Sequence, residues 1–74
     1  MKKIKLNINK LLKERGLSQR KLAQMSNVRA AAINQMSQNK REKVSLHHLE
    51  RIANVLNIDD INELITLEDE AKDG

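Results

Sequence analysis

Several residue types are missing from this sequence. Its 74 residues include no cysteine, proline, phenylalanine, tyrosine or tryptophan, and only two glycines. The absence of cysteine excludes disulfides and cysteine-based metal sites. The absence of aromatic side chains argues against RNA-recognition and single-strand-binding modules, which stack bases on aromatic rings. The remaining composition fits one small helical domain with an aliphatic core.

Long apolar runs are also missing. No stretch is apolar and long enough to cross a bilayer. The N-terminal MKKIKLNINK begins with positive charge but lacks the continuous apolar run of a signal peptide. We therefore expect a cytoplasmic protein without a membrane partner.

Acidic residues are scarce in most of the chain and concentrated near its C-terminus. Residues 1–58 hold 13 lysines and arginines against three acids, a net charge of +10. Residues 59–74 hold seven acids against one lysine, a net charge of −6. A concentrated basic region is typical of a protein that binds a polyanion. The alternative is a surface that merely keeps the protein soluble.

The segment 17–39 predicts two short helices joined by a tight turn at residues 26–28. If residues 29–38 are helical, one side of that helix is apolar and faces the core; its residues are Val28, Ala32, Ile33 and Met36. The opposite side carries amides and methyl groups but no charge; its residues are Ala30, Ala31, Asn34, Gln35 and Gln38. Amides that reach base edges, and small residues that touch thymine methyl groups, suit a helix in the DNA major groove. The alternative is a solvent face filled for helix propensity, since alanine is the best helix former.

Polar residues at regular intervals predict where the helices begin and end. Asn7, Ser18 and Ser45 are good N-cap residues, and each has a pair of apolar residues placed to form a hydrophobic staple around it. Arg29 would be a poor N-cap for the helix over 29–38, so that helix start is expected to need support from Asn27 or from a DNA phosphate. Left-handed helix ends are expected at Gly16, Asn27 and Asn39.

The apolar residues outside 17–39 predict the rest of the fold. Leu46 begins an inward stripe that continues along a helix to residue 57, and Met25 and Met36 are expected in the core. Asp59 or Asp60 is expected to cap a short fifth helix carrying Ile61 and Leu64.

Alternating or β-prone residues at the two ends predict short strands over 2–6 and 64–68. Their charges are complementary, because lysines in the first would meet acids at the end of the second and just after it. The strands could pair within one chain or between two, and the alternative is that both ends are loose extensions.

The pattern LSQRKLA…V…I…L.RIANVLNI resembles the XRE family of phage-repressor and Cro-type helix-turn-helix proteins. The resemblance covers about residues 7–65. It implies an all-α, five-helix, lambda-repressor-like domain that binds double-stranded DNA as a homodimer on a near-palindromic operator. The small sheet from the terminal segments would be an addition to these helices.

The resemblance also implies roles for individual residues. The positions that read bases are Arg29, Ala30, Ala31, Asn34 and Gln35. The positions that contact the DNA backbone are Ser18, Gln19, Arg20, Gln38, Lys40, Arg41 and Lys43. Three residues depart from the family pattern: Asn27 and Asn39 replace glycines, and Ser37 replaces a glutamate. Alanines stand at positions 30 and 31, where the family has larger polar residues that contact bases. Arg29 and Gln35 would therefore carry most of the hydrogen-bond specificity.

Other chemistry finds little support in the sequence. His47 and His48 are adjacent, so on a helix they point about 100° apart and do not form an i, i+4 metal-ligand pair. The carboxylates have no apolar surroundings that would raise a pKa for acid–base catalysis. We expect no enzyme activity, no metal and no cofactor.

Two functions fit these observations. The first is a sequence-specific transcription regulator, most simply a repressor, formed by residues 1–68 with a frayed acidic tail over 69–74. The second is a protein-interaction module, such as the antitoxin of a toxin–antitoxin pair or a phage regulatory partner, which would bind a protein through its acidic C-terminal segment.

Overall fold

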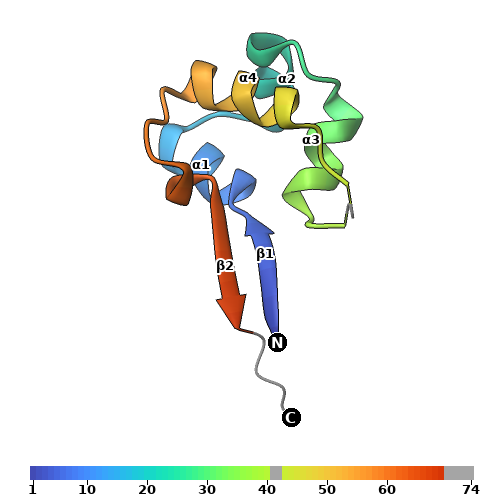
Figure 1. Ribbon diagram of the computed structural model, residues 1–74. Coiled ribbons are helices and arrows are strands. Elements are labelled where there is room, and N and C mark those ends of the chain that lie inside the picture. Colours follow the sequence, from blue (N-terminus) through green and yellow to red (C-terminus); the bar gives the residue numbers. More distant parts are fainter. Residues whose placement is uncertain (41–42, 70–74) are drawn as a thin grey trace.

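The computed structural model describes residues 1–40 and 43–69 of the chain. Within these residues the helices form one cluster, and two strands form a ribbon that projects from it with the N-terminus at its far end (Figure 1). The elements in chain order are β1 (Lys2–Leu6), α1 (Ile8–Arg15), α2 (Gln19–Ser26), α3 (Ala30–Ser37), α4 (Leu46–Leu56), the 3-10 turn η1 (Ile61–Glu63) and β2 (Ile65–Asp69). The mostly helical fold and the small sheet are confirmed.

The predicted fifth helix is wrong, because residues 61–63 form only a single 3-10 turn. Asp60 caps this turn by accepting a hydrogen bond from the Asn62 backbone N–H at 2.9 Å. The turn then stops at Leu64, which is fully buried and whose carbonyl accepts the Asn7 N–H at 2.9 Å. That bond draws the chain toward β1, so the β-branched residues that follow extend into β2 instead of continuing a helix.

The predicted helix boundaries hold at most positions. Ser18 accepts a hydrogen bond from Lys21 N–H at 3.0 Å, and Ser45 accepts one from His48 N–H at 3.4 Å. Asn7 occupies the N-cap of α1, but its side chain does not cap that helix. Its amide instead donates to the Glu63 carbonyl at 3.4 Å and joins the start of α1 to η1. The expected left-handed residues are confirmed, with φ of 65° at Gly16, 58° at Asn27 and 57° at Asn39.

A single aliphatic core lies between the helices and the base of the ribbon. Its fully buried side chains are Ile8, Leu22, Ile33, Met36, Ile52 and Leu64. Two residues expected inside are instead exposed, Met25 by 41% and Leu46 by 73%. At about 100° of rotation per residue, each lies roughly 80–90° from the centre of its helix's buried stripe.

The two strands pair antiparallel within one chain, with Leu6 opposite Ile65 at the base and Lys2 opposite Asp69 at the tip. The second strand begins one residue later than predicted, because Leu64 is in the core. The expected charge complementarity is present: Lys5 Nζ lies 3.9 Å from a Glu68 carboxylate oxygen, and Lys2 Nζ lies 3.7 Å from one of Asp69. The predicted fraying of the acidic tail falls largely on residues 70–74, outside the described residues.

Candidate nucleic-acid interface

The turn between α2 and α3 sets the angle at which α3 leaves the body. Asn27 takes the left-handed conformation that a tight turn requires, and Val28 behind it is buried. Arg51 Nη1 on α4 donates to the Asn27 carbonyl at 3.4 Å, which ties the turn to the helical cluster. Arg29 is the N-cap residue of α3, as expected, and its side chain makes no capping hydrogen bond. The first N–H groups of α3 are therefore not capped by this residue.

Helix α3 has the two faces that its sequence predicts. The inner residues Val28, Ala32, Ile33 and Met36 are all buried, and the outer residues Ala30, Ala31, Asn34, Gln35 and Gln38 are all exposed. The outer face is thus an uncharged surface of three amides and two methyl groups. We call these five residues the amide face.

A network of hydrogen-bonded amides joins α3 to α2, and sequence reasoning missed it. Gln19 Nε2 donates to Ser37 Oγ at 2.9 Å and to Asn9 Oδ1 at 3.1 Å, while Gln19 Oε1 accepts from Asn34 Nδ2 at 3.1 Å. Gln38 Nε2 donates to Asn34 Oδ1 at 3.0 Å. The Asn34–Gln38 pair has the i, i+4 spacing that could have signalled it. The contacts of Gln19 span ten to eighteen residues and had no local signal.

This network changes what the predicted contact residues can offer a ligand. An amide nitrogen carries two hydrogens, and both hydrogens of Gln19 Nε2 are used inside the protein. An anion at the start of α2 would therefore meet the backbone N–H groups rather than this side chain. Asn34 and Gln38 are held in place by their partners, whereas Gln35 lies outside the network.

Positive side chains lie at both ends of the amide face. Arg29 is exposed at its N-terminal end, and Lys40 and Lys43 are exposed beyond its C-terminal end. Arg20 is exposed at the start of α2. Arg41, which was also predicted to contact the DNA backbone, lies outside the described residues. The described cations therefore flank the uncharged strip and do not interrupt it.

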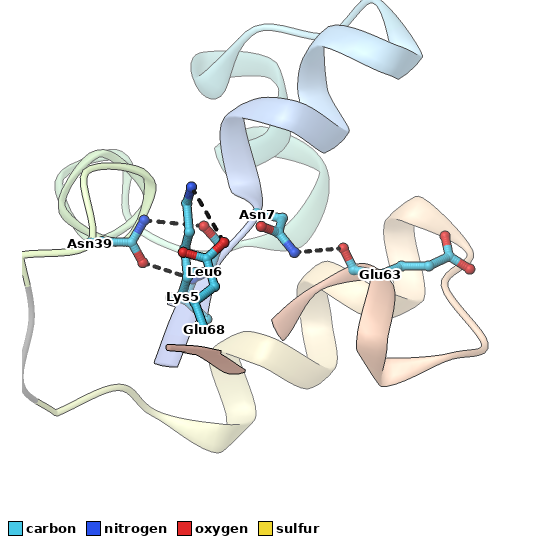
Figure 2. A network of polar contacts seen from close by, with 6 residues as sticks. All are labelled: Lys5, Leu6, Asn7, Asn39, Glu63 and Glu68. Carbon is cyan, nitrogen blue, oxygen red and sulfur yellow. Dashed lines mark hydrogen bonds and ion pairs between the residues drawn. The ribbon is translucent and has the colours of Figure 1, made fainter. Parts of the chain in front are cut away.

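Asn39 anchors the C-terminal end of α3 to β1, a second contact that sequence reasoning missed. Its side chain accepts from the Leu6 backbone N–H at 2.7 Å and donates to the Leu6 carbonyl at 3.2 Å (Figure 2). The amide thus pairs with the outer edge of β1 as a neighbouring strand would. The two residues are 33 positions apart, so the recognition of the left-handed Asn39 did not reveal its partner.

The described residues hold neither a metal-ligand cluster nor a membrane-spanning helix. In the part of the chain that the structure describes, no group of three His, Cys, Asp or Glu side chains could hold a metal ion. His47 Nδ1 instead lies 3.6 Å from a Glu50 carboxylate oxygen on the same helix. No helix within the described ranges combines the length and apolarity needed to span a membrane.

Most of the chain matches a known domain family. The Cro/C1-type HTH DNA-binding domain matches residues 7–70, which include every helix and β2 but not β1. The chain belongs to this family. Comparison with curated proteins and with solved structures found no match. Membership implies DNA binding and a domain type that is typically not an enzyme, and the expected XRE-family resemblance is confirmed.

Proposed function

We propose that this Cro/C1-type domain is a sequence-specific transcription regulator that places α3 in the DNA major groove, most simply as a repressor that blocks promoter access. The amide face carries the proposal, because exposed amides can donate to and accept from base edges, and exposed methyl groups can contact thymine methyl groups. Its flanking cations would meet the phosphates on either side of the groove.

The proposed base contacts follow from the hydrogen-bond donors, acceptors and methyl groups that each exposed side chain can offer. Gln35 can make a bidentate contact with adenine and Arg29 with guanine, each discriminating by about 1–3 kcal/mol. Ala30 and Ala31 can sense only a thymine methyl group. Asn34 would present an amide whose orientation the Gln19 network already fixes.

The backbone contacts surround this reading surface. The N-terminus of α2, with Ser18, Gln19 and Arg20, would bind one phosphate through its backbone N–H groups and the Arg20 charge. At the other end of α3, Gln38, Lys40, Arg41 and Lys43 would follow the opposite strand of the groove. A homodimer would set two α3 helices about one DNA turn apart on a near-palindromic site.

The test is selection of preferred duplexes from a random DNA pool, followed by affinity measurements on the selected site. Gln35→Ala should relax the base preference at its position, whereas Lys40→Ala should weaken binding to all duplexes about equally. Asn54→Ala is a matched control, because Asn54 is an exposed amide on α4. If Gln35→Ala kept the full sequence preference, this orientation of α3 would be wrong.

Salt dependence tests the cationic flanks separately. If each subunit neutralises about four phosphates, the slope of log affinity against log salt should be near −7 for a dimer. A slope shallower than about −3 would contradict the assignment of Lys40, Arg41 and Lys43 to the DNA backbone.

The alternative is a protein partner bound through the acidic C-terminal segment, of which residues 70–74 lie outside the described part of the chain. A capture experiment with and without residues 70–74 tests it. The deletion should begin at 70, because residues 65–69 pair with β1. Loss of a protein partner with unchanged DNA binding would support this second role.

A further inference from the structure

The two faces of the ribbon differ in polarity. Residues opposite each other in an antiparallel pair lie on the same face. Ile4 is opposite Leu67, next to the base pair of the buried Leu6 and the half-buried Ile65, whereas Lys5 is opposite Thr66 on the other face. Ile4 and Leu67 are each 65% exposed. The ribbon therefore presents an apolar pair to solvent on one side only.

A groove lies beside this apolar face. It has a volume of about 680 Å³, and the residues that line it from the ribbon, α3, α4 and the segment before α4 include Ile4, Leu6, Met36, Val44, Leu46 and Ile65. A smaller hollow of about 290 Å³ shares Leu46 and Ile65 with it and extends to Ile61. We call these two hollows together the ribbon groove. Of the six large hydrophobic residues that are exposed in the described chain, four lie on its rim or on the adjoining ribbon face: Ile4, Leu46, Ile61 and Leu67.

Charge argues against pairing of a second chain along the ribbon edges. A two-fold axis would set β1 against β1 or β2 against β2. The first arrangement opposes lysines and the second opposes Glu68 and Asp69, and like charges placed opposite each other destabilise a sheet. The base of the β1 edge is also occupied by Asn39. A second copy is therefore expected at the apolar face and not at an edge.

Shape and area favour that second copy as the occupant of the groove. Each chain carries both a projecting pair, Ile4 and Leu67, and a hollow between Leu46 and Ile61. In a two-fold dimer the ribbon of each copy can therefore lie in the groove of the other copy. If each of the four side chains buries about 100 Å², two copies bury roughly 800 Å² of apolar side chain before the rims are counted. With the rims, the total approaches the roughly 1,200–2,000 Å² of a stable interface.

We propose that a second copy of this chain occupies the ribbon groove in a two-fold dimer, with Ile4 and Leu67 of each copy packed against Leu46 and Ile61 of the other. Met36 and Asn39, at the end of α3, also line the groove. The proposed contact therefore lies next to the C-terminal end of each α3 helix. Its bearing on DNA binding rests on the proposed function, whereas the self-association does not.

Sedimentation of the full chain without DNA tests the contact through two variants. Leu46→Glu places a charge in the groove, and Ile4→Lys places the opposite charge on the ribbon. Each variant alone should raise the dimer dissociation constant roughly 100-fold or more, because the substitution is present in both contacts of the two-fold dimer. When the two variants are mixed, they should form a heterodimer. One of its two contacts pairs the new lysine with the new glutamate, and the other contact contains only wild-type residues.

The controls separate this proposal from failure to fold and from failure of the proposed function. Met25→Lys alters an exposed hydrophobic residue on α2 and should leave association unchanged. Circular dichroism should show wild-type helix content in all variants, because both altered side chains are mostly exposed. A monomeric wild type, variants that associate like wild type, or a mixture that stays monomeric would each overturn the proposed contact. Wild-type dimers that lack DNA preference would overturn the proposed function and leave the contact standing.

Discussion

The helix-turn-helix and the ribbon are stabilised in different ways. In α2 and α3 the side chains that hold the structure are fully buried, as Leu22 and Ile33 are. In the ribbon, Ile4 and Leu67 remain mostly exposed, and the pairing depends on backbone hydrogen bonds and surface charges. An isolated two-stranded ribbon is marginal in water. Its stability must therefore come largely from its base and from Asn39, and in the proposed dimer also from the second copy on its apolar face.

The largest effect is expected in the core of the helix-turn-helix. Ile33→Ala should lower the free energy of unfolding by about 2–5 kcal/mol, because it leaves a cavity behind α3. That is a large part of the total stability of a small domain. Urea denaturation followed by circular dichroism measures it.

Two further variants calibrate that loss. Ile33→Val removes one methylene and should cost about 0.5–1.5 kcal/mol. Met25→Ala alters an exposed side chain on α2 and should cost less than either change at Ile33. If Ile33→Ala and Met25→Ala cost the same, the helix-turn-helix is not stabilised mainly by its buried side chains.

A smaller effect is expected where the two regions meet. Asn39→Gly keeps the left-handed conformation but removes both hydrogen bonds to Leu6, at a cost of about 1–2 kcal/mol. Asn39→Ala should cost about 1 kcal/mol more, because alanine is strained at positive φ. Thermal unfolding measures both changes, and amide hydrogen exchange should become faster at the Leu6 N–H.

Asn57 provides the matched control for Asn39. It ends α4 with φ of 58°, close to the 57° of Asn39. Asn57→Gly is expected to change stability by about 0.5 kcal/mol or less, since glycine adopts this conformation freely. Equal effects of the two glycine substitutions would show that Asn39 acts only as a helix end and does not anchor β1.

The smallest effect is expected from the ion pairs on the ribbon. The side chains of Lys5 and Glu68 are 52% and 55% exposed, so solvent screens their attraction. Glu68→Gln should therefore lower stability by only about 0–0.5 kcal/mol, and added salt should remove the difference. A larger, salt-insensitive loss would mean that Glu68 has another role. Paired thermal melts at low and high salt decide this.

The helix-turn-helix could be predicted from sequence because its signals are local. Ser18 accepts a hydrogen bond from a backbone N–H three residues later, Asn27 bends the chain at its own position, and the apolar stripe of α3 repeats within eight residues. The division of α3 into a buried face and the amide face needed only this periodicity. The family resemblance then covered the same stretch.

The features that sequence could not predict depend on distant partners. The bonds of Asn39 to Leu6 and of Gln19 to Ser37 join residues 33 and 18 positions apart. The one-residue shift of β2 and the loss of the fifth helix both follow from Leu64, which could be recognised as apolar but not as the place where the chain turns toward β1. Tertiary contacts at that residue overrode the local helix signal.

Synthesis from the N-terminus imposes an order on these contacts. Leu6 emerges from the ribosome long before Ile65, its partner in the last described element. The first strand is therefore unpaired while α1 to α4 are synthesised. The helices can assemble in that interval from contacts near in sequence, whereas the ribbon closes last. Asn39 emerges between the two strands, so its side chain can form its hydrogen bonds with Leu6 before β2 is synthesised.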